Sequence, residues 1–121
     1  MKNKIKSFED LEILRLSHSF VLEVCKIIKS FPKTENYILT EQIIRTAHSI
    51  PANIAGCMKR FSTKELTRFL VFARSSVQEI KYHLILANNL GYIDTNTFEN
   101  FNNNYTLLGK KINSLISSIK F

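Results

Sequence analysis

The chain has 121 residues, of which 45% are hydrophobic, a size and composition that suit one domain with its own core. Charged residues interrupt the apolar runs every few positions, so no segment reaches the ~18 residues of a membrane span, and the basic N-terminus is followed by no signal-peptide core. The two cysteines, Cys25 and Cys57, show no pairing pattern and predict a reducing, cytoplasmic location.

The net charge of +7 is concentrated in two short segments. Residues 1–6 hold three lysines and no acid, and residues 59–74 hold five basic residues against the single acid Glu65, while the rest of the chain sums to zero. Concentrated positive charge is typical of a surface that binds a polyanion, although it also keeps a protein soluble. Both interpretations stay open at this point.

The first predicted helix opens after Ser7, ends at Phe31-Pro32, and carries apolar residues on two nearly opposite sides. A small bundle covers only one side of each helix, so the second apolar stripe predicts a neighbouring subunit. We expect His18 to be a hydrogen-bonded core histidine and both cysteines to be small buried hydrophobes. The first stripe is Leu11, Leu14, His18, Val21, Cys25 and Ile28, and the second is Ile13, Leu16, Phe20, Val24, Ile27 and Phe31.

The second predicted helix begins at a Thr34 cap and contains Pro51. An internal proline removes one backbone hydrogen bond at a cost of about 3 kcal/mol, which predicts a bend. The freed carbonyls need donors, and Arg45 and Asn53 are the expected ones. The polar line that runs into the bend is Gln42, Arg45, Ser49 and Asn53, and the expected buried positions are Leu39, Ile43, Ile50, Ile54 and Met58.

Two further helices follow, with clear start and stop signals. Ser62 with Glu65 is a capping box, Gly91 ends the third helix, and Asp94 or Thr95 caps the fourth. With no strand pattern or linker, the chain is predicted to be an all-α, antiparallel up-down-up-down four-helix bundle, one domain over residues 1–121 with a flexible basic arm at residues 1–7. The predicted core stripes are Leu66, Phe69 or Leu70, Ala73, Val77, Ile80, Leu84 and Ala87, then Phe98, Phe101, Tyr105, Leu108, Ile112, Leu115 and Ile119.

One segment of the chain is specific enough to carry a family resemblance. Ser49-Ile50-Pro51-Ala52-Asn53-Ile54-Ala55, with matches from Phe31-Pro32 to Leu90-Gly91-Tyr92-Ile93, resembles the bacterial four-helix-bundle family associated with intervening sequences in 23S ribosomal RNA. The resemblance implies a bundle that assembles as a ring of five subunits. The family is also similar to the accessory variability determinant of diversity-generating retroelements, a basic bundle that works with a reverse transcriptase and nucleic acid.

The chain departs from the family pattern at a few positions. An acid and a glycine usually follow the motif, where this chain has Gly56 and Cys57. Ile44 stands where a basic residue is common, and Ser75 stands where glycine is common. The missing acid argues against any role that needs a carboxylate beside Asn53.

Catalytic and metal-binding patterns are absent from the sequence. Glu79 and His83 are four residues apart and no second such pair exists, whereas di-metal bundles need Glu-x-x-His on two helices. His18, His48 and His83 fall on three different predicted helices and form no ligand motif. We therefore expect no catalytic residue, no metal and no cofactor.

The start of the third predicted helix is the candidate polyanion site. Arg60, Lys64 and Arg68 are spaced by four residues and share one face, and the helix N-terminus adds about half a positive charge. Phe61 or Phe72 could stack on a base. The alternative is a solvated basic turn in which Phe61 packs as a hydrophobic staple. The predicted nucleic-acid-binding residues are Lys59, Arg60, Phe61, Lys64, Arg68 and Arg74.

Two function classes follow from the sequence. The first is a homo-oligomeric accessory protein that binds RNA or single-stranded nucleic acid, in which several weak phosphate contacts act together. The second is a structural or adaptor oligomer whose partner is a protein such as a polymerase-like enzyme. Salt-dependent binding to arbitrary RNA favours the first class, and nuclease-resistant co-purification of one protein favours the second.

Overall fold

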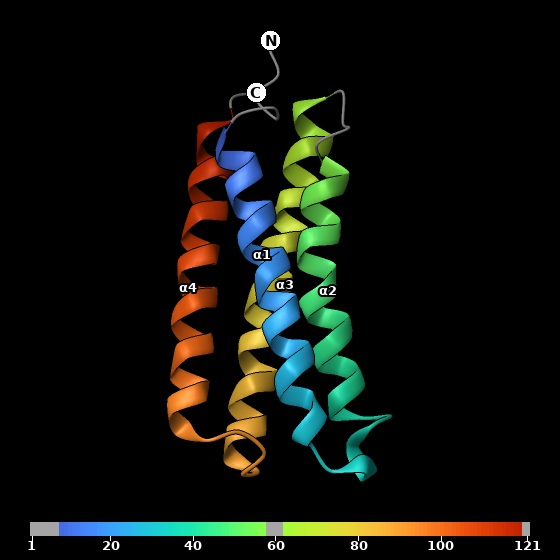
Figure 1. Ribbon diagram of the computed structural model, residues 1–121. Coiled ribbons are helices and arrows are strands. Elements are labelled where there is room, and N and C mark those ends of the chain that lie inside the picture. Colours follow the sequence, from blue (N-terminus) through green and yellow to red (C-terminus); the bar gives the residue numbers. More distant parts are fainter. Residues whose placement is uncertain (1–7, 58–61, 120–121) are drawn as a thin grey trace.

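The computed structural model describes residues 8–57 and 62–119, and within them the chain forms four α-helices and no β-strand. Figure 1 shows the helices packed lengthwise and alternating in direction, with α1 and α3 running down and α2 and α4 running up. The predicted all-α four-helix fold is confirmed, and none of the described helices is long and apolar enough to cross a membrane. The elements are α1 (Phe8–Ile27), the 3₁₀ turns η2 (Ile28–Ser30) and η3 (Lys33–Glu35), α2 (Leu39–Cys57), α3 (Thr63–Asn89) and α4 (Thr95–Ser118).

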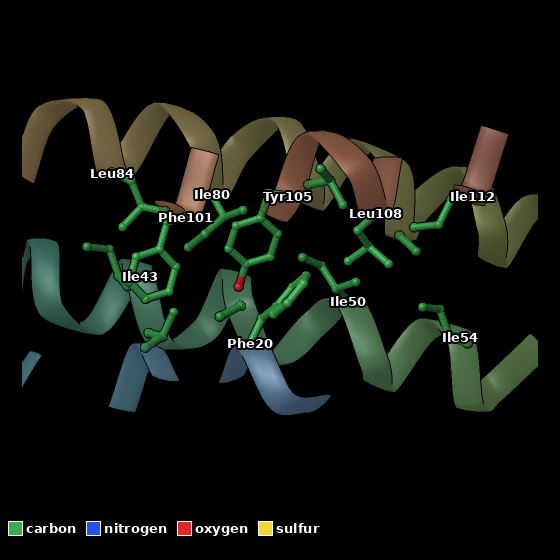
Figure 2. Packing of buried hydrophobic residues seen from close by; sticks show 14 of the residues in the cluster. Phe20, Ile43, Ile50, Ile54, Ile80, Leu84, Phe101, Tyr105, Leu108 and Ile112 are labelled. Atoms are coloured by element: carbon green, nitrogen blue, oxygen red, sulfur yellow. The ribbon is translucent and has the colours of Figure 1, made fainter. Parts of the chain in front are cut away.

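The core is one apolar cluster to which all four helices contribute. Tyr105 of α4 lies at its centre, and Figure 2 shows its hydroxyl pointing away from α4 toward Phe20 of α1. In α3 the inward position is Leu70, while Phe69 is only partly buried. The spacing-based stripes of α3 and α4 are confirmed at Leu66, Leu70, Ala73, Val77, Ile80, Leu84, Ala87, Phe101, Tyr105, Leu108, Ile112 and Leu115, with Phe98 and Ile119 partly buried.

While Leu14, Val21 and Ile28 of the first apolar stripe of α1 are only partly buried against the core, the second stripe lies deeper in it. Its members Ile13, Phe20 and Val24 are buried, whereas His18 and Cys25 of the first stripe are exposed. The expectations of a core histidine and of a buried Cys25 are therefore wrong for the single chain, because periodicity identifies apolar faces without saying which one turns inward. The other cysteine, Cys57 in α2, is buried as predicted, and Ser7 and Met58 lie outside the described residues.

The connection between α1 and α2 is longer than the sequence suggested. Thr34 lies inside η3 and α2 begins only at Leu39, so the predicted Thr34 cap is wrong. The extended backbone of Pro32 leads directly into this short 3₁₀ turn. A tertiary contact then holds the turn, because the Tyr92 hydroxyl after α3 donates a 2.7 Å hydrogen bond to Glu35 Oε2. The same contact raises the pKa of Tyr92, chiefly through that hydrogen bond.

The second helix continues through its proline. Pro51 lies inside α2, and the preceding turn is joined to α3 by side chains. The Ser49 hydroxyl donates to the Thr46 carbonyl at 2.7 Å and shares a 2.7 Å hydrogen bond with the Ser76 hydroxyl of α3. The Asn53 amide donates to the Ser49 carbonyl at 2.8 Å. Asn53 thus donates to a carbonyl near the proline. The carbonyl that loses its helical N–H to Pro51 is that of Ala47, four residues earlier, so the predicted donors to the freed carbonyl and the angle of the bend stay predictions.

Side-chain caps begin α3 and α4. The Ser62 hydroxyl oxygen accepts from the Glu65 N–H at 3.1 Å, as the capping box predicts. Asp94, rather than Thr95, caps α4, since its carboxylate accepts from the Thr97 N–H at 2.7 Å. That hydrogen bond lowers the pKa of Asp94.

Gly91 ends α3 in the left-handed conformation, with φ of +82°. Its N–H donates to the Asn88 carbonyl at 3.0 Å, and the next N–H, of Tyr92, donates to the Ala87 carbonyl at 2.9 Å. This pair of bonds is the Schellman motif, which satisfies the last carbonyls of a helix and favours glycine at this position. The predicted helix end at Gly91 is therefore confirmed.

Candidate nucleic-acid interface

The start of α3 presents the described part of the predicted polyanion site. Lys64 and Arg68 are exposed and four residues apart, so they share one face of the helix. The Ser62 cap fixes the helix N-terminus, whose positive dipole end lies beside these side chains. The other predicted residues of this segment, Lys59, Arg60 and Phe61, lie outside the described residues.

Arg68 lies beside two aromatic rings that contact each other. Its guanidinium carbon lies 6.0 Å from the ring centroid of Phe69 and 5.7 Å from that of Phe72. The two rings meet edge to face at 6.2 Å, and Phe69 packs on the core while Phe72 is 45% exposed. A cation–π contact positions a guanidinium without neutralising its charge. The arrangement offers a cation for a phosphate and an open ring for a base.

Arg74 lies on a different side of α3 from Lys64 and Arg68. It is half-buried, and its Nη1 donates a 2.7 Å hydrogen bond to Asn113 Oδ1 of α4. Six residues after Arg68 the helix has turned well past the shared face, which explains the separation. Among the described members of the predicted set, Arg74 therefore does not share a surface with Lys64 and Arg68.

A groove between α3 and α4 contains Arg74 and two cations that the sequence reasoning missed. Lys81 Nζ donates to Thr106 Oγ1 of α4 at 2.8 Å, and Lys110 is exposed. Lys81 is seven residues after Arg74, and this spacing puts both on one face of α3. Spacing along α3 does not show that Lys110 of α4 lies at the same groove. We call this the α3/α4 groove; its lining includes the polar residues Arg74, Ser75, Gln78, Lys81, Thr106, Lys110 and Asn113.

The polar line of α2 reaches the seam with α3 at Ser49. Ser49 contacts Ser76, and Thr46, one position beyond Arg45, donates to Glu79 Oε2 at 3.3 Å. Gln42 and Asn53 are half-buried and Arg45 is exposed, so the line is partly solvated. These contacts give Ser49 and Asn53 a structural role beside Pro51.

Histidines and carboxylates do not gather in the described part of the chain. His18 and His48 are exposed, and the half-buried His83 has its Nε2 3.4 Å from Glu79 Oε2. Over residues 8–57 and 62–119, no group of three His, Cys, Asp or Glu side chains could hold a metal ion.

The comparison with protein families decides where the chain belongs. The sequence model of the 23S rRNA-intervening sequence protein family matches residues 9–114. The chain belongs to this family. A similar solved structure is that of a protein of unknown function from the S23 ribosomal protein family of Bacteroides thetaiotaomicron VPI-5482, at 25% identity and a TM-score of 0.85, covering 92% of this chain and 100% of that one. Comparison with curated proteins gives no match. That protein of the S23 ribosomal protein family thus has the same fold as this chain.

Proposed function

We propose that this member of the intervening-sequence family is a non-enzymatic, cytoplasmic, homo-oligomeric accessory protein that binds RNA or another single-stranded nucleic acid. The observation that carries the proposal is Arg68, an exposed cation placed beside the open ring of Phe72 at the start of α3. Nonspecific single-strand binding uses this combination, because phosphates pair with cations and every base has a face that stacks on an aromatic ring.

Oligomerisation strengthens this interface. One subunit offers a net charge of +7 and a few phosphate contacts, each of which is weak alone. A ring of subunits repeats the same contacts along one strand, so binding at one site raises the effective concentration at the next. The family name, which refers to intervening sequences of 23S rRNA, is consistent with an RNA partner.

The test replaces Lys59, Arg60, Lys64 and Arg68 with glutamine and measures oligouridine binding over a salt series. The described members of this set, Lys64 and Arg68, are exposed, so the bundle should stay folded. We expect weaker binding and a flatter dependence on salt, with each lost phosphate contact removing about 0.7 from the log–log slope.

The matched control replaces Lys2, Lys4 and Lys6 of the N-terminal arm with glutamine, and it should have the smaller effect. If the parent binds no oligouridine at low salt, the proposed function is wrong. If the parent binds and the quadruple variant keeps its slope, binding occurs elsewhere on the molecule.

An adaptor role has an observation of its own. Tyr37 and Ile38, side by side before α2, are 89% and 65% exposed. Adjacent large apolar side chains at the end of a bundle suit a contact with another protein. Replacing both with serine should abolish nuclease-resistant co-purification of a protein partner if this function holds. Such co-purification, without oligouridine binding, would favour the adaptor over the RNA-binding protein.

A further inference from the structure

We propose that the α3/α4 groove is a binding site for phosphate groups, which Arg74, Lys81 and Lys110 would neutralise. The site itself is argued from the groove alone. The source of the phosphate that we favour, the backbone of a nucleic-acid strand, rests on the proposed function. This site is distinct from the start of α3, because Arg74 points to another side of the helix than Arg68.

Three cations from two helices line this groove. Arg74 and Lys81 come from α3 and are half-buried, and Lys110 comes from α4 and is exposed. No Asp or Glu is found among the described residues that line the groove. The groove therefore presents positive charge without a counterion of its own, unlike the mixed charges of an ordinary solvated surface.

The two half-buried cations are held by neutral partners. Asn113 Oδ1 accepts from Arg74 Nη1 at 2.7 Å, and Thr106 Oγ1 accepts from Lys81 Nζ at 2.8 Å. An amide or hydroxyl oxygen fixes the position of a cation but leaves its charge uncompensated. Removing such a charge from water costs free energy that an incoming anion offsets. Because both side chains are already positioned, less entropy is lost when the anion binds.

Acids on adjoining faces are engaged away from the groove. Glu79 of α3 accepts from Thr46 of α2 at 3.3 Å and lies 3.4 Å from His83 Nε2. Glu12 of α1 pairs with Lys111 at 3.3 Å, on the α1 side of α4. Neither contact brings a carboxylate to the cations of the groove.

The shape of the groove suits an extended anion rather than a single small ion. Its volume is about 430 Å³ and it opens to solvent. Arg74 and Lys81 are seven residues apart, which is about 10 Å along the helix. Gln78, between them in the sequence, adds a neutral amide donor. Phosphodiester backbones are bound by such rows of cations interspersed with amide and hydroxyl groups.

The test compares two triple variants that lose the same charge. One is Arg74→Gln/Lys81→Gln/Lys110→Gln. The control is Lys26→Gln/Lys29→Gln/Lys33→Gln, at exposed positions in and just after the last turn of α1. Fluorescein-labelled oligouridine is titrated by anisotropy over a salt series, and pyrophosphate is titrated by calorimetry. We expect the groove variant to lower the log–log salt slope by about 2 and the pyrophosphate affinity by about tenfold or more, and the control to change both little.

The outcomes separate this site from the proposed function. A groove variant that matches the control overturns the groove site, even where the parent binds oligouridine well. A parent that binds pyrophosphate through the groove but no oligouridine supports the groove and overturns the RNA-binding function, and a parent that binds neither overturns both. A smaller oligomer mass for the groove variant would assign the groove to a contact between copies and overturn the proposal. Lys81→Gln/Lys110→Gln, which keeps the Arg74–Asn113 bond, repeats the test if the triple variant fails to fold.

Discussion

Among single residues, Tyr105 combines good packing with an unpartnered polar group. Its side chain is fully buried, and its ring contacts Phe20 edge-on at 5.1 Å and stacks on Phe101 at 6.4 Å. Its hydroxyl has no hydrogen-bond partner within the described residues. A buried hydroxyl without a partner costs about 1–3 kcal/mol. The same burial raises the pKa of Tyr105 far above its usual range.

We predict that Tyr105→Phe keeps the packing, removes the unpartnered hydroxyl, and raises the free energy of unfolding by about 1 kcal/mol. Urea unfolding, monitored by circular dichroism, measures this change in the free energy of unfolding. Tyr92→Phe is the matched control, because it loses the hydrogen bond to Glu35 and should lower stability. A Tyr105→Phe protein less stable than Tyr92→Phe would contradict this account of the core.

Because of the same buried hydroxyl, we predict that the free energy of unfolding falls at alkaline pH. In the unfolded chain Tyr105 ionises near its ordinary pKa of about 10, whereas in the folded chain its raised pKa keeps it protonated. The free energy of unfolding should therefore be unaffected by this group below pH ~10 and should fall as the pH rises further. Because Tyr92 also has a raised pKa, Tyr105→Phe should reduce this fall rather than abolish it.

Residue positions were predictable from the sequence wherever only one interpretation of the pattern was possible. α4 has a single apolar stripe, so Tyr105 had to face inward. α1 has two stripes, so its pattern predicts His18 and Cys25 in the interior, although both are exposed. The partner of Arg74 is Asn113, 39 residues away, and spacing along one helix does not reveal such a contact.

At the scale of whole elements, two glycines have opposite roles. Gly91 ends α3 at φ of +82°, and a Cβ added there would have nothing within 4 Å. Gly109 lies inside α4, where a Cβ would meet Val77 Cγ1 of α3 at 3.5 Å, an ordinary contact. At Gly91 a larger residue has room for its side chain but must adopt a left-handed backbone conformation. At Gly109 the backbone is helical, and the side chain has only to fit against Val77.

We predict effects of opposite sign for alanine at these two positions. Gly91→Ala should lower the free energy of unfolding by about 1 kcal/mol, the cost of a left-handed conformation with a Cβ. Gly109→Ala should raise it by about 0.5–1 kcal/mol through helix propensity. Thermal and urea unfolding of the pair, each serving as the control for the other, provide the measurement. Stabilisation by Gly91→Ala would show that the α3 end rearranges.

The start of α3 and the start of α2 show why some element boundaries were predictable. Ser62 and Glu65 determine the first by a contact within one turn, which the sequence displays directly. α2 begins at Leu39, after a turn that is held by Tyr92 from a distant part of the chain. Thr34 resembled a cap because local patterns carry no information about that tertiary contact.

For the whole molecule, the outer face of α1 is the feature that bears on assembly. The exposed members of the first α1 stripe, His18 and Cys25, lie beside the half-buried Leu14, Val21 and Ile28, so this face remains partly apolar in the single chain. The family resemblance implies a ring of five. The double stripe predicts that α1 contacts a neighbouring subunit, and in a ring this contact would bury the partly apolar face.

We predict that light scattering gives the mass of an oligomer, and that Cys25→Asp reduces this mass while the subunit stays folded, because Cys25 is exposed. Burying a new carboxylate between subunits disfavours assembly. Ser19→Asp adds the same charge to an exposed position off the stripe and should leave the mass unchanged. A parent that is monomeric at micromolar concentration would refute the ring, and equal effects of the two variants would place the interface elsewhere.

The seam between α1 and α4 is hollowed at two places along its length. One groove of about 310 Å³ lies beside Ile13 and Leu115, and another of about 560 Å³ lies beside Phe20 and Phe101. A folded protein opens locally where its elements bury the least apolar surface against one another. Hydrogen exchange of the α1 amides should therefore proceed by detachment of α1 while α2, α3 and α4 stay folded. A second subunit or a nucleic-acid strand that binds across this seam would slow that exchange. Protection of the α1 amides from hydrogen exchange would therefore detect binding without a labelled ligand.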